Sequence, residues 1–348
     1  MRALTFQGVE EVRLGTLPDP LIEESGDVVV RTGMTAICGS DLHVYHGRET
    51  GLDLGTVLGH EFVGEIVEVG TAVERFRVGD RIVSPFSTSC GACFYCERGL
   101  TARCARGQLF GWREDGSGLH GAQAEYVRVP LADSTLVLAP EDLPPEVALL
   151  AGDVLSTGLF SAETADIGPG CVVGIVGCGP VGLMAVAAAL SLGARLVFAI
   201  DWIGERLDLA ADFGAVPVNF HDVEPSSVVH EATDGRGVDA VLEAVGNSAA
   251  GHLAMSLVRP GGTIMAAGVH TEPDFPFTPM AAYDKNLTFK TGRCSARHYM
   301  ERSLALARSE RFPLARVISH RLPLEAGVEA YRTFAEKLDG CTKVILIP

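Results

Sequence analysis

The first 130 residues consist of short apolar and alternating runs that Gly, Pro and Asp interrupt every few residues. Runs of this length with continuous or alternating apolar character predict β-strands. The pattern predicts strands at 28–31, 65–69, 80–83 and 124–129. Short strands separated by turn residues are typical of an irregular β-barrel. We therefore expect a small β-rich domain in this part of the chain.

The pattern changes after Pro144 and Pro145, where apolar residues recur at helical spacing and predict one helix over 146–165. Strands and helices then alternate, with strands predicted at 171–176, 196–200, 238–245 and 263–269, and helices at 181–192 and 205–213. This alternation indicates a parallel sheet with helices on both faces. The remaining chain predicts helices at 296–308 and 326–338 and a final strand at 343–347, which could complete either domain.

Length and charge narrow the classes of function. A chain of 348 residues is long enough for two domains, each with its own core. The formal net charge of −16 repels nucleic-acid phosphates and anionic lipid headgroups. The sequence shows neither an apolar stretch of membrane-spanning length nor a secretion signal after Met1. We therefore expect a cytoplasmic protein without a nucleic-acid or membrane partner.

Four of the nine cysteines lie close together, at Cys90, Cys93, Cys96 and Cys104. Four thiolates at this spacing can surround one zinc ion without ligands from elsewhere. This many cysteines, several at metal-binding spacing, fit a reducing compartment better than a framework of disulfides. The spacing predicts a structural zinc site, and a pair of disulfides or an empty site is the alternative.

A second set of potential metal ligands is spread along the chain. Cys38 precedes a Gly-Ser-Asp turn, and His60 lies in a Gly-His-Glu sequence. Both belong to predicted loops, where functional groups concentrate. Asp153 is a single carboxylate in an apolar stretch, and it is either a third ligand or a helix N-cap. Three protein ligands leave one position of zinc open for chemistry, so this set predicts a catalytic metal.

A glycine-rich turn follows the strand predicted at 171–176. Gly177, Gly179 and Gly182 match the pattern G-x-G-x-x-G, in which Pro180 and Val181 open the next helix. The first glycine permits a tight turn, the second lets a pyrophosphate approach the backbone, and the third lets the helix pack closely. Free N–H groups at the start of the helix favour phosphate. The motif predicts a dinucleotide site, and a domain that has lost this ligand is the alternative.

The end of the next strand distinguishes between two coenzymes. Asp201 lies 19 residues after Gly182. A carboxylate there accepts hydrogen bonds from ribose hydroxyls and repels a 2′-phosphate, which favours NAD over NADP. Arg206 follows five residues later, where it binds a phosphate, stacks near the adenine or lies on the solvent face of its helix.

The order and separation of these motifs resemble the zinc-dependent medium-chain alcohol dehydrogenases over essentially the whole chain. The matching motifs are Cys38-Gly-Ser-Asp-x-His43, Gly59-His60-Glu61-x-x-Gly64, Val78-Gly79-Asp80-Arg81-Ile82, the four-cysteine lobe and the glycine-rich turn. The resemblance implies an α/β protein with a β-rich, GroES-like catalytic domain and a Rossmann domain with a doubly wound parallel sheet. It assigns residues 1–152 and 294–348 to the first, with the zinc lobe at about 88–106, and residues 153–293 to the second.

The resemblance also assigns roles to single residues around the metal. It places the catalytic zinc on Cys38, His60 and Asp153. It implies that Asp41 orients the ligating histidine. It further implies that Glu61 can enter the metal's coordination shell.

For the substrate and the coenzyme, the resemblance implies further contacts. Ser40 accepts the proton of the substrate hydroxyl, and His43 exchanges that proton with solvent. Trp112 lies in the substrate pocket. The implied coenzyme contacts beyond the glycine-rich turn, Asp201 and Arg206 are Val245, Gly268, Val269 and Lys343, the last near the pyrophosphate.

These observations predict a zinc-containing, NAD-dependent alcohol dehydrogenase with two zinc ions per chain, one catalytic and one structural. It would transfer a hydride between a small secondary or primary alcohol and NAD. A polyol dehydrogenase or a glutathione-independent formaldehyde dehydrogenase is the alternative. A non-catalytic or quinone-reductase-like member of the fold is another, although that class typically lacks the metal ligands. The resemblance also implies a homo-oligomer, either a tetramer or a dimer.

Overall fold

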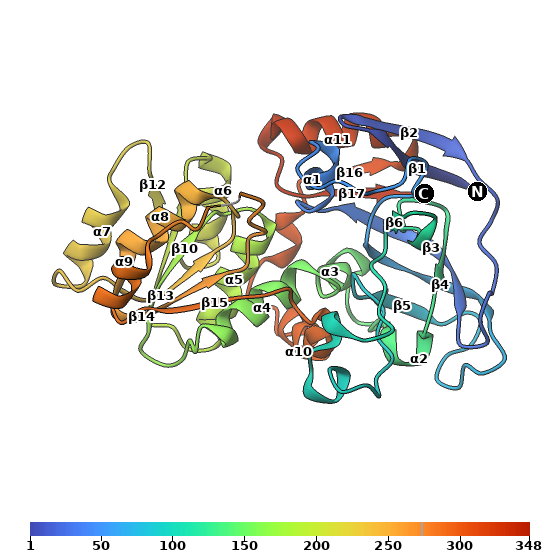
Figure 1. The fold of residues 1–348 in the computed structure, drawn as a ribbon, viewed down its shortest axis with the longest axis horizontal. Coiled ribbons are helices and arrows are strands. Elements are labelled where there is room, and N and C mark those ends of the chain that lie inside the picture. The colour runs from blue at the N-terminus through green and yellow to red at the C-terminus, as the bar shows by residue number, and fades with distance from the viewer. Residues whose placement is uncertain (273) are drawn as a thin grey trace. The chain divides into compact units, whose positions relative to one another are not determined.

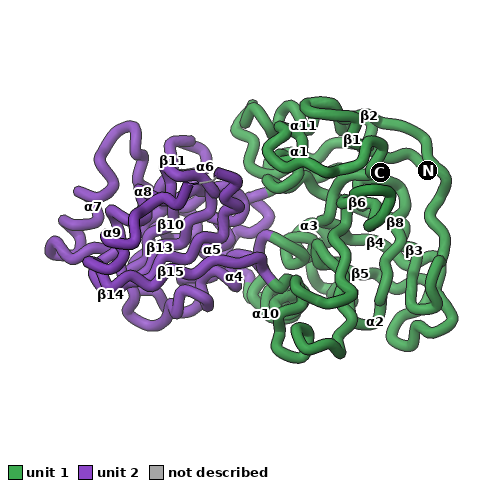
Figure 2. The backbone as a smooth tube through the Cα atoms, in the orientation of Figure 1, with its two compact units in different colours: residues 1–153, 295–309, 318–348 green, residues 154–294, 310–317 purple. Residues whose placement is uncertain are grey.

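The computed structural model describes residues 1–272 and 274–348. The chain divides into two compact units, which Figure 2 shows in different colours. Unit 1 consists of Met1–Asp153, Ser295–Ser309 and Ile318–Pro348, and unit 2 consists of Val154–Cys294 and Glu310–Val317. The sequence expectation differs by one residue at the two main boundaries and assigns 310–317 to the first domain. Asp153 therefore belongs to the same unit as Cys38 and His60.

Unit 1 is built on a mixed seven-stranded sheet. Its strands are β3 (Val28–Ile37), β4 (Glu61–Val69), β5 (Arg81–Ser84), β8 (Tyr126–Val129), β9 (Val137–Leu138), β16 (His320–Pro323) and β17 (Val344–Ile347). The order is β16-β17-β3-β4-β5-β9, and β8 also pairs with β3. Two further antiparallel pairs are β1 (Arg2–Gly8) with β2 (Glu11–Thr16), and β6 (Trp112–Glu114) with β7 (Ser117–Leu119).

Short helices join these strands. They are α1 (Asp41–Tyr45), α2 (Ala132–Thr135), α3 (Pro145–Leu150), α10 (Ala296–Arg308), α11 (Gly327–Glu336) and the 3-10 turns η1 (Cys96–Arg98), η2 (Thr101–Arg103), η4 (Leu324–Ala326) and η5 (Leu338–Gly340). In α11 the buried residues Ala330, Tyr331 and Phe334 recur at helical spacing, which explains why this segment forms an amphipathic helix. They pack into one apolar cluster with Ile37 and Leu346.

The central strand β3 is covered on both faces. It contributes Ile37 to the cluster beneath α11, and Val28 and Val30 to a second cluster with Phe62 and Ile66. The sequence pattern predicts only 28–31, because Arg31, Thr32 and Gly33 interrupt the apolar run, although the strand continues to residue 37.

The register of three strands brings distant residues together. β17 runs antiparallel to β3 with Val344 opposite Ile37, and β4 runs antiparallel to β3 with Glu61 opposite Ala36. The end of β3 and the starts of β4 and β17 therefore lie side by side. The pairing of β17 with β3 also returns the C-terminal segment to the N-terminal unit, as the family resemblance implies (Figure 1).

Unit 2 contains a parallel six-stranded sheet in the order β12-β11-β10-β13-β14-β15. Its elements are α4 (Val154–Thr164), β10 (Val172–Val176), α5 (Pro180–Ser191), β11 (Leu196–Asp201), α6 (Gly204–Asp212), β12 (Val216–Asn219), α7 (Pro225–Ala232), β13 (Val238–Glu243), α8 (Ser248–Leu257), β14 (Val258–Ala266), α9 (Pro279–Asp284), β15 (Thr288–Thr291) and η3 (Leu314–Val317). The prediction of a doubly wound parallel sheet is confirmed (Figure 1). Throughout the two described ranges, no helix combines the length and apolar character needed to cross a bilayer.

Several predicted elements differ from the observed ones. The prediction of a single helix over 146–165 is wrong, because residues 151–153 are not helical and separate α3 from α4. Apolar residues continue across this break, so periodicity does not reveal it. The helices and strands that the pattern missed are short or partly exposed, namely β1, β2, α1, β6, β7, α2, β9, β12, α7, α8, α9, β15 and β16. Strands predicted over 238–245 and 263–269 end earlier, at Glu243 and Ala266, and the following residues form turns.

One prediction concerns the packing of α5 on the turn that precedes it. A Cβ atom on Gly182 would lie 1.8 Å from the carbonyl oxygen of Gly177, so Gly182→Ala forces the backbone apart. We expect the variant to lose about 1–3 kcal/mol of unfolding free energy in urea denaturation. Gly204→Ala is the matched control, because its Cβ meets no atom within 4 Å. Equal stability of the two variants would contradict this close packing.

Candidate functional site

Four potential metal ligands converge in unit 1. Cys38 follows β3, His60 and Glu61 lie at the start of β4, and Asp153 lies between α3 and α4. Their ligand atoms all lie within 4.8 Å of one another. A Cβ on Gly152 would lie 2.2 Å from the carbonyl oxygen at the end of β5, so the missing side chain allows the α3–α4 junction to approach the sheet. The structure therefore brings together all three predicted ligands of the catalytic metal.

Asp41 fixes the orientation of the imidazole of His60. Its Oδ1 lies 3.3 Å from Nδ1 of His60, and its Oδ2 accepts a hydrogen bond from the backbone N–H of Cys38 at 2.9 Å. The other ring nitrogen, Nε2, lies 3.4 Å from Oδ2 of Asp153. Burial lowers the pKa of His60, but Asp41 and Asp153 outweigh burial and raise this pKa well above its usual value. Nε2 therefore faces the other ligands.

The same site crowds acidic groups into a buried volume. Sγ of Cys38 lies 3.2 Å from Oδ2 of Asp153. Burial, with the charges of Asp153 and Glu61, raises the pKa of the Cys38 thiol to about 11. Burial also opposes ionisation of Asp153, but His60 outweighs it and holds the pKa of that carboxyl below its ordinary value. Such a set of sulfur, nitrogen and oxygen donors fits zinc.

Lys343 forms an ion pair with Glu61 inside this site. Both side chains are 0% exposed, and Nζ of Lys343 lies 2.6 Å from Oε1 of Glu61. Burial raises the pKa of Glu61 to about 6 although Lys343 opposes the shift. The other oxygen, Oε2, is buried and has no hydrogen-bond partner among the described residues. An acceptor oxygen left without a donor next to three other ligands fits a nearby metal ion.

This arrangement corrects the expectation for Lys343. The residue was expected near a coenzyme pyrophosphate, but its ammonium group has no exposed surface and already binds Glu61 and, at 3.4 Å, the carbonyl oxygen of Ile37. A fully buried, paired ammonium group does not reach a phosphate. Lys343 instead balances charge at the candidate metal site. The antiparallel pairing of β17 with β3 places it there.

Two residues next to this site can carry a proton. Oγ of Ser40 lies 3.4 Å from Nε2 of His60, on the side of the imidazole that faces the other ligands. His43 lies in α1, and its Nδ1 is buried without a partner among the described residues. Burial lowers the pKa of His43 below its ordinary value, which favours the neutral imidazole.

Aromatic side chains form part of the surroundings. The ring of Phe86 meets His60 edge-on, with centroids 6.3 Å apart, and the sequence analysis did not identify it. Trp112 is half-buried at the start of β6 and packs against the apolar cluster beneath α11. Gly111 brings this strand against the loop before His60, because its Cβ would lie 3.1 Å from the backbone nitrogen of Gly59. Phe86 lies two residues after β5, where only its position beyond a strand end could have indicated it.

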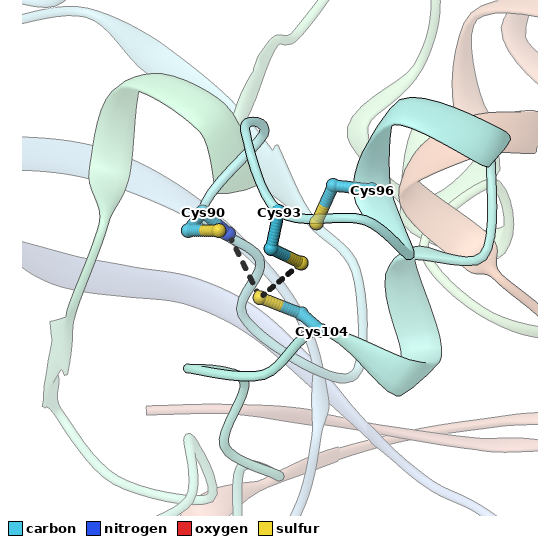
Figure 3. A group of neighbouring side chains, drawn as sticks. All are labelled: Cys90, Cys93, Cys96 and Cys104. Carbon is cyan, nitrogen blue, oxygen red and sulfur yellow. Dashed lines mark hydrogen bonds between the residues drawn. The ribbon is translucent and has the colours of Figure 1, made fainter.

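The four-cysteine lobe forms a second candidate metal centre, and Figure 3 shows its side chains converging. Their sulfur atoms lie within 4.8 Å of one another. The backbone N–H of Cys90 donates to Sγ of Cys104 at 3.2 Å. A hydrogen bond from the backbone of Ala105 is the main reason that the pKa of Cys93 falls to about 6. No disulfide joins Cys90, Cys93, Cys96 and Cys104, which favours a metal site over the disulfide alternative.

In unit 2, the glycine-rich turn lies between β10 and α5. Gly177 has a φ of +92°, which permits the tight turn, and Pro180 opens the helix with Val181 after it. Asp201, at the end of β11, accepts a hydrogen bond from the backbone N–H of Cys178 at 2.7 Å. Its carboxylate therefore lies directly against the turn. Nη1 of Arg206 lies 3.8 Å from the position that a Cβ on Gly179 would occupy.

Two further turns complete the candidate coenzyme site. The side chain of Val245, after β13, lies against the turn, since a Cβ on Gly177 would meet its Cγ2 at 2.5 Å. Gly268 and Val269, after β14, lie against Gly246. The predicted coenzyme residues thus meet at the carboxyl ends of β10, β11, β13 and β14, with the exception of Lys343. The strand order reverses between β10 and β13, which is where open α/β sheets bind ligands.

Comparisons with known proteins identify the family of the chain. Residues 24–141 match the family model "Alcohol dehydrogenase GroES-like domain", and residues 180–309 match "Zinc-binding dehydrogenase". "Zinc-type alcohol dehydrogenase B" of Aspergillus flavus is 42% identical over 343 residues, which cover 96% of this chain and 78% of that protein. The chain belongs to the zinc-dependent alcohol dehydrogenase family. The predicted GroES-like and Rossmann architecture is confirmed.

Other members of the zinc-dependent alcohol dehydrogenase family are similar over most of the chain. The structure of alcohol dehydrogenase TADH from Thermus sp. ATN1 matches with a TM-score of 0.93 and 42% identity, covering 100% of this chain and 99% of that chain. "NADP-dependent isopropanol dehydrogenase" of Thermoanaerobacter brockii is 35% identical over 299 residues, 84% of each protein.

The ion pair between Lys343 and Glu61 generates a stability prediction. Lys343→Met leaves a buried carboxylate without its counter-charge, so we expect a loss of about 3–5 kcal/mol of unfolding free energy in urea denaturation. The double variant Lys343→Met/Glu61→Leu should recover most of this loss. Lys290→Met is the control, because it removes a more exposed ion pair with Asp166 and should cost at most about 1 kcal/mol. A Lys343→Met variant as stable as this control would contradict the presence of a buried ion pair between Lys343 and Glu61.

Metal analysis tests the two candidate metal centres in this zinc-dependent alcohol dehydrogenase. We expect about two zinc ions per chain after dialysis, and about one in either Cys38→Ser or Cys104→Ser, because each variant removes a ligand from a different centre. Cys341→Ser, which changes a buried thiol outside both centres, should keep about two. Plasma emission spectrometry measures the content. Undiminished zinc in Cys38→Ser would exclude a metal at that site.

Proposed function

We propose that the chain is a zinc-containing alcohol dehydrogenase that transfers a hydride between a small alcohol and NAD and interconverts the alcohol with a ketone or an aldehyde. The observation that carries the proposal is the convergence of Cys38, His60 and Asp153, with Asp41 orienting the histidine. The family membership supports the reaction class. The glycine-rich turn with Asp201 supports the coenzyme.

Cys38, His60 and Asp153 would hold the catalytic zinc, and the four cysteines of the lobe would hold the structural one. The catalytic ion, when bound, supplies a Lewis acid that makes the alcohol proton more acidic. Glu61 contributes its unpaired Oε2 on the same side, while Lys343 holds its Oε1. Lys343 therefore limits the freedom of Glu61 to change its position.

Ser40 and His43 would move the proton of the alcohol. Oγ of Ser40 lies next to Nε2 of His60, so it accepts the proton close to the ligand set. His43 then takes the proton and passes it to solvent, because its lowered pKa leaves the imidazole neutral and able to accept. NAD, when bound, supplies the hydride acceptor.

The preference for NAD is proposed from Asp201. Its side chain is 5% exposed, and both of its oxygens accept hydrogen bonds from backbone N–H groups, which holds the negative charge at the end of β11. A fixed negative charge there repels the 2′-phosphate of NADP. One relative is named as NADP-dependent, so the coenzyme is the part of the proposal that most needs a direct assay.

The substrate class is proposed from the aromatic residues. Phe86 lies edge-on to His60. Trp112 begins β6, directly after Gly111, whose backbone lies against Gly59. Bulky apolar side chains favour small secondary or primary alcohols over polyols, whose additional hydroxyl groups require polar partners. The same reasoning makes polyols and formaldehyde the informative comparisons in an assay.

The proposed enzyme is a cytoplasmic homo-oligomer, a tetramer or a dimer. Four cysteines at metal-binding spacing, with no disulfide between them, support a reducing compartment. In unit 2, Met280 and Tyr283 of α9 are 68% and 79% exposed, and exposed apolar groups of this kind support association with a second copy.

A substrate panel tests the proposed function. Primary, secondary and polyhydric alcohols and formaldehyde are assayed with NAD and with NADP by absorbance of the reduced coenzyme. We expect the highest kcat/KM with a small secondary or primary alcohol and NAD.

Ser40→Ala should lower kcat by about 10²–10⁴-fold and keep its zinc, because only the proton acceptor is lost. Ser226→Ala, which changes a half-buried serine of α7 in unit 2, is the control. Full kcat in Ser40→Ala would contradict the proposed proton path. A wild type that is inactive with every substrate would contradict the proposed dehydrogenase activity.

A further inference from the structure

Glu243 is a buried carboxylate that the proposed mechanism does not use. It ends β13 and is 1% exposed. Its Oε1 accepts hydrogen bonds from the backbone N–H groups of Val245 at 2.7 Å and Gly246 at 2.8 Å. Its Oε2 lies 2.8 Å from Nε2 of His270, which donates to it. A buried carboxylate is costly unless donors satisfy it, and three donors do so here.

The backbone of the same residue binds a second turn. Its carbonyl oxygen accepts hydrogen bonds from the N–H groups of Ala267 at 2.8 Å and Gly268 at 3.0 Å. Glu243 therefore holds the turn after β13 through its side chain and the turn after β14 through its backbone and through His270. Five hydrogen bonds converge on one residue between the two turns.

The two turns also touch backbone to backbone. A Cβ on Gly246, which has a φ of +83°, would lie 2.6 Å from the carbonyl oxygen of Val269. A Cβ on Gly268 would lie 2.2 Å from the backbone nitrogen of Gly246. Because no side chain separates them, a shift of one turn displaces the other directly.

The position of these turns indicates which part of a dinucleotide they would meet. Asp201 ends β11, on one side of β10, and would take the adenosine ribose. The turns after β13 and β14 lie on the opposite side of β10. A dinucleotide whose pyrophosphate lies on the glycine-rich turn therefore directs its nicotinamide half toward Val245 and Val269.

We propose that Glu243 and His270 are positioning residues for the nicotinamide half of the coenzyme. They hold the backbone of the two turns in the arrangement that receives it, and they do not contact the substrate. The inference rests on the proposed function, because it requires a bound dinucleotide. It predicts that loss of the His270 hydrogen bond weakens coenzyme binding and disturbs its alignment without affecting the zinc.

Three variants of the full-length, zinc-loaded protein test this inference. His270→Leu removes the donor, and His270→Gln keeps a donor at similar reach. Glu272→Gln changes a nearby carboxylate that accepts a hydrogen bond from the backbone N–H of Ser248. NADH affinity is measured by fluorescence titration, and kcat is measured at saturating NAD. We expect His270→Leu to weaken NADH binding by about 5- to 100-fold, because an acceptor of Glu243 is left unsatisfied, and to lower kcat. His270→Gln and Glu272→Gln should stay within about threefold of the wild type, a range well below the effect of a lost buried hydrogen bond.

The outcomes separate the inference from the proposed function. Wild-type affinity and kcat in His270→Leu, or equal losses in His270→Gln and His270→Leu, would overturn the positioning role while NADH binding by the wild type leaves the proposed function intact. A wild type that binds neither NADH nor NADPH would refute both. Unchanged zinc content and melting temperature in His270→Leu, together with weaker binding, would support positioning over a general loss of structure.

Discussion

The structure depends most on the balance of buried charge at the ends of β3, β4 and β17. Cys38, Glu61 and Asp153 share one buried volume with two basic side chains, Lys343 and His60. The register of β3 with its two neighbours imposes this crowding, and a shift by one residue would turn the side chains to the opposite face. A bound cation would favour the ionised thiolate of Cys38, which burial and the nearby carboxylates disfavour. Uncompensated, such burial is unfavourable.

Each unit places its functional groups by removing side chains where backbones must meet. Gly152 allows the segment with Asp153 to approach β5, and Gly182 allows α5 to pack on the phosphate-binding turn. Gly246 and Gly268 do the same for the turns held by Glu243. The chemistry-bearing residues then lie on short loops whose positions the sheets determine. The candidate metal ligands therefore lie in unit 1, and the candidate coenzyme residues lie in unit 2.

Much of the site could be predicted from the sequence because its residue types are uncommon and their spacing is specific. The four cysteines, the turn at Gly177 and the set of Cys38, His60 and Asp153 are examples. The pairing of Lys343 with Glu61 could not be predicted, since 282 positions separate them and they meet through the pairing of β3 with both β17 and β4. The contact of Glu243 with His270 likewise has no characteristic spacing. The non-helical residues 151–153 before α4 were not predicted, because apolar residues continue on both sides of them. This segment places Asp153 next to the other ligands.

The proposed catalytic site therefore requires a metal ion at the end of β3. Anomalous X-ray diffraction at the zinc absorption edge, from crystals grown without chelator, tests this most directly. The account predicts a peak bounded by Cys38, His60 and Asp153, in addition to one among the four cysteines of the lobe. A filled lobe with no peak between Cys38, His60 and Asp153 would contradict it.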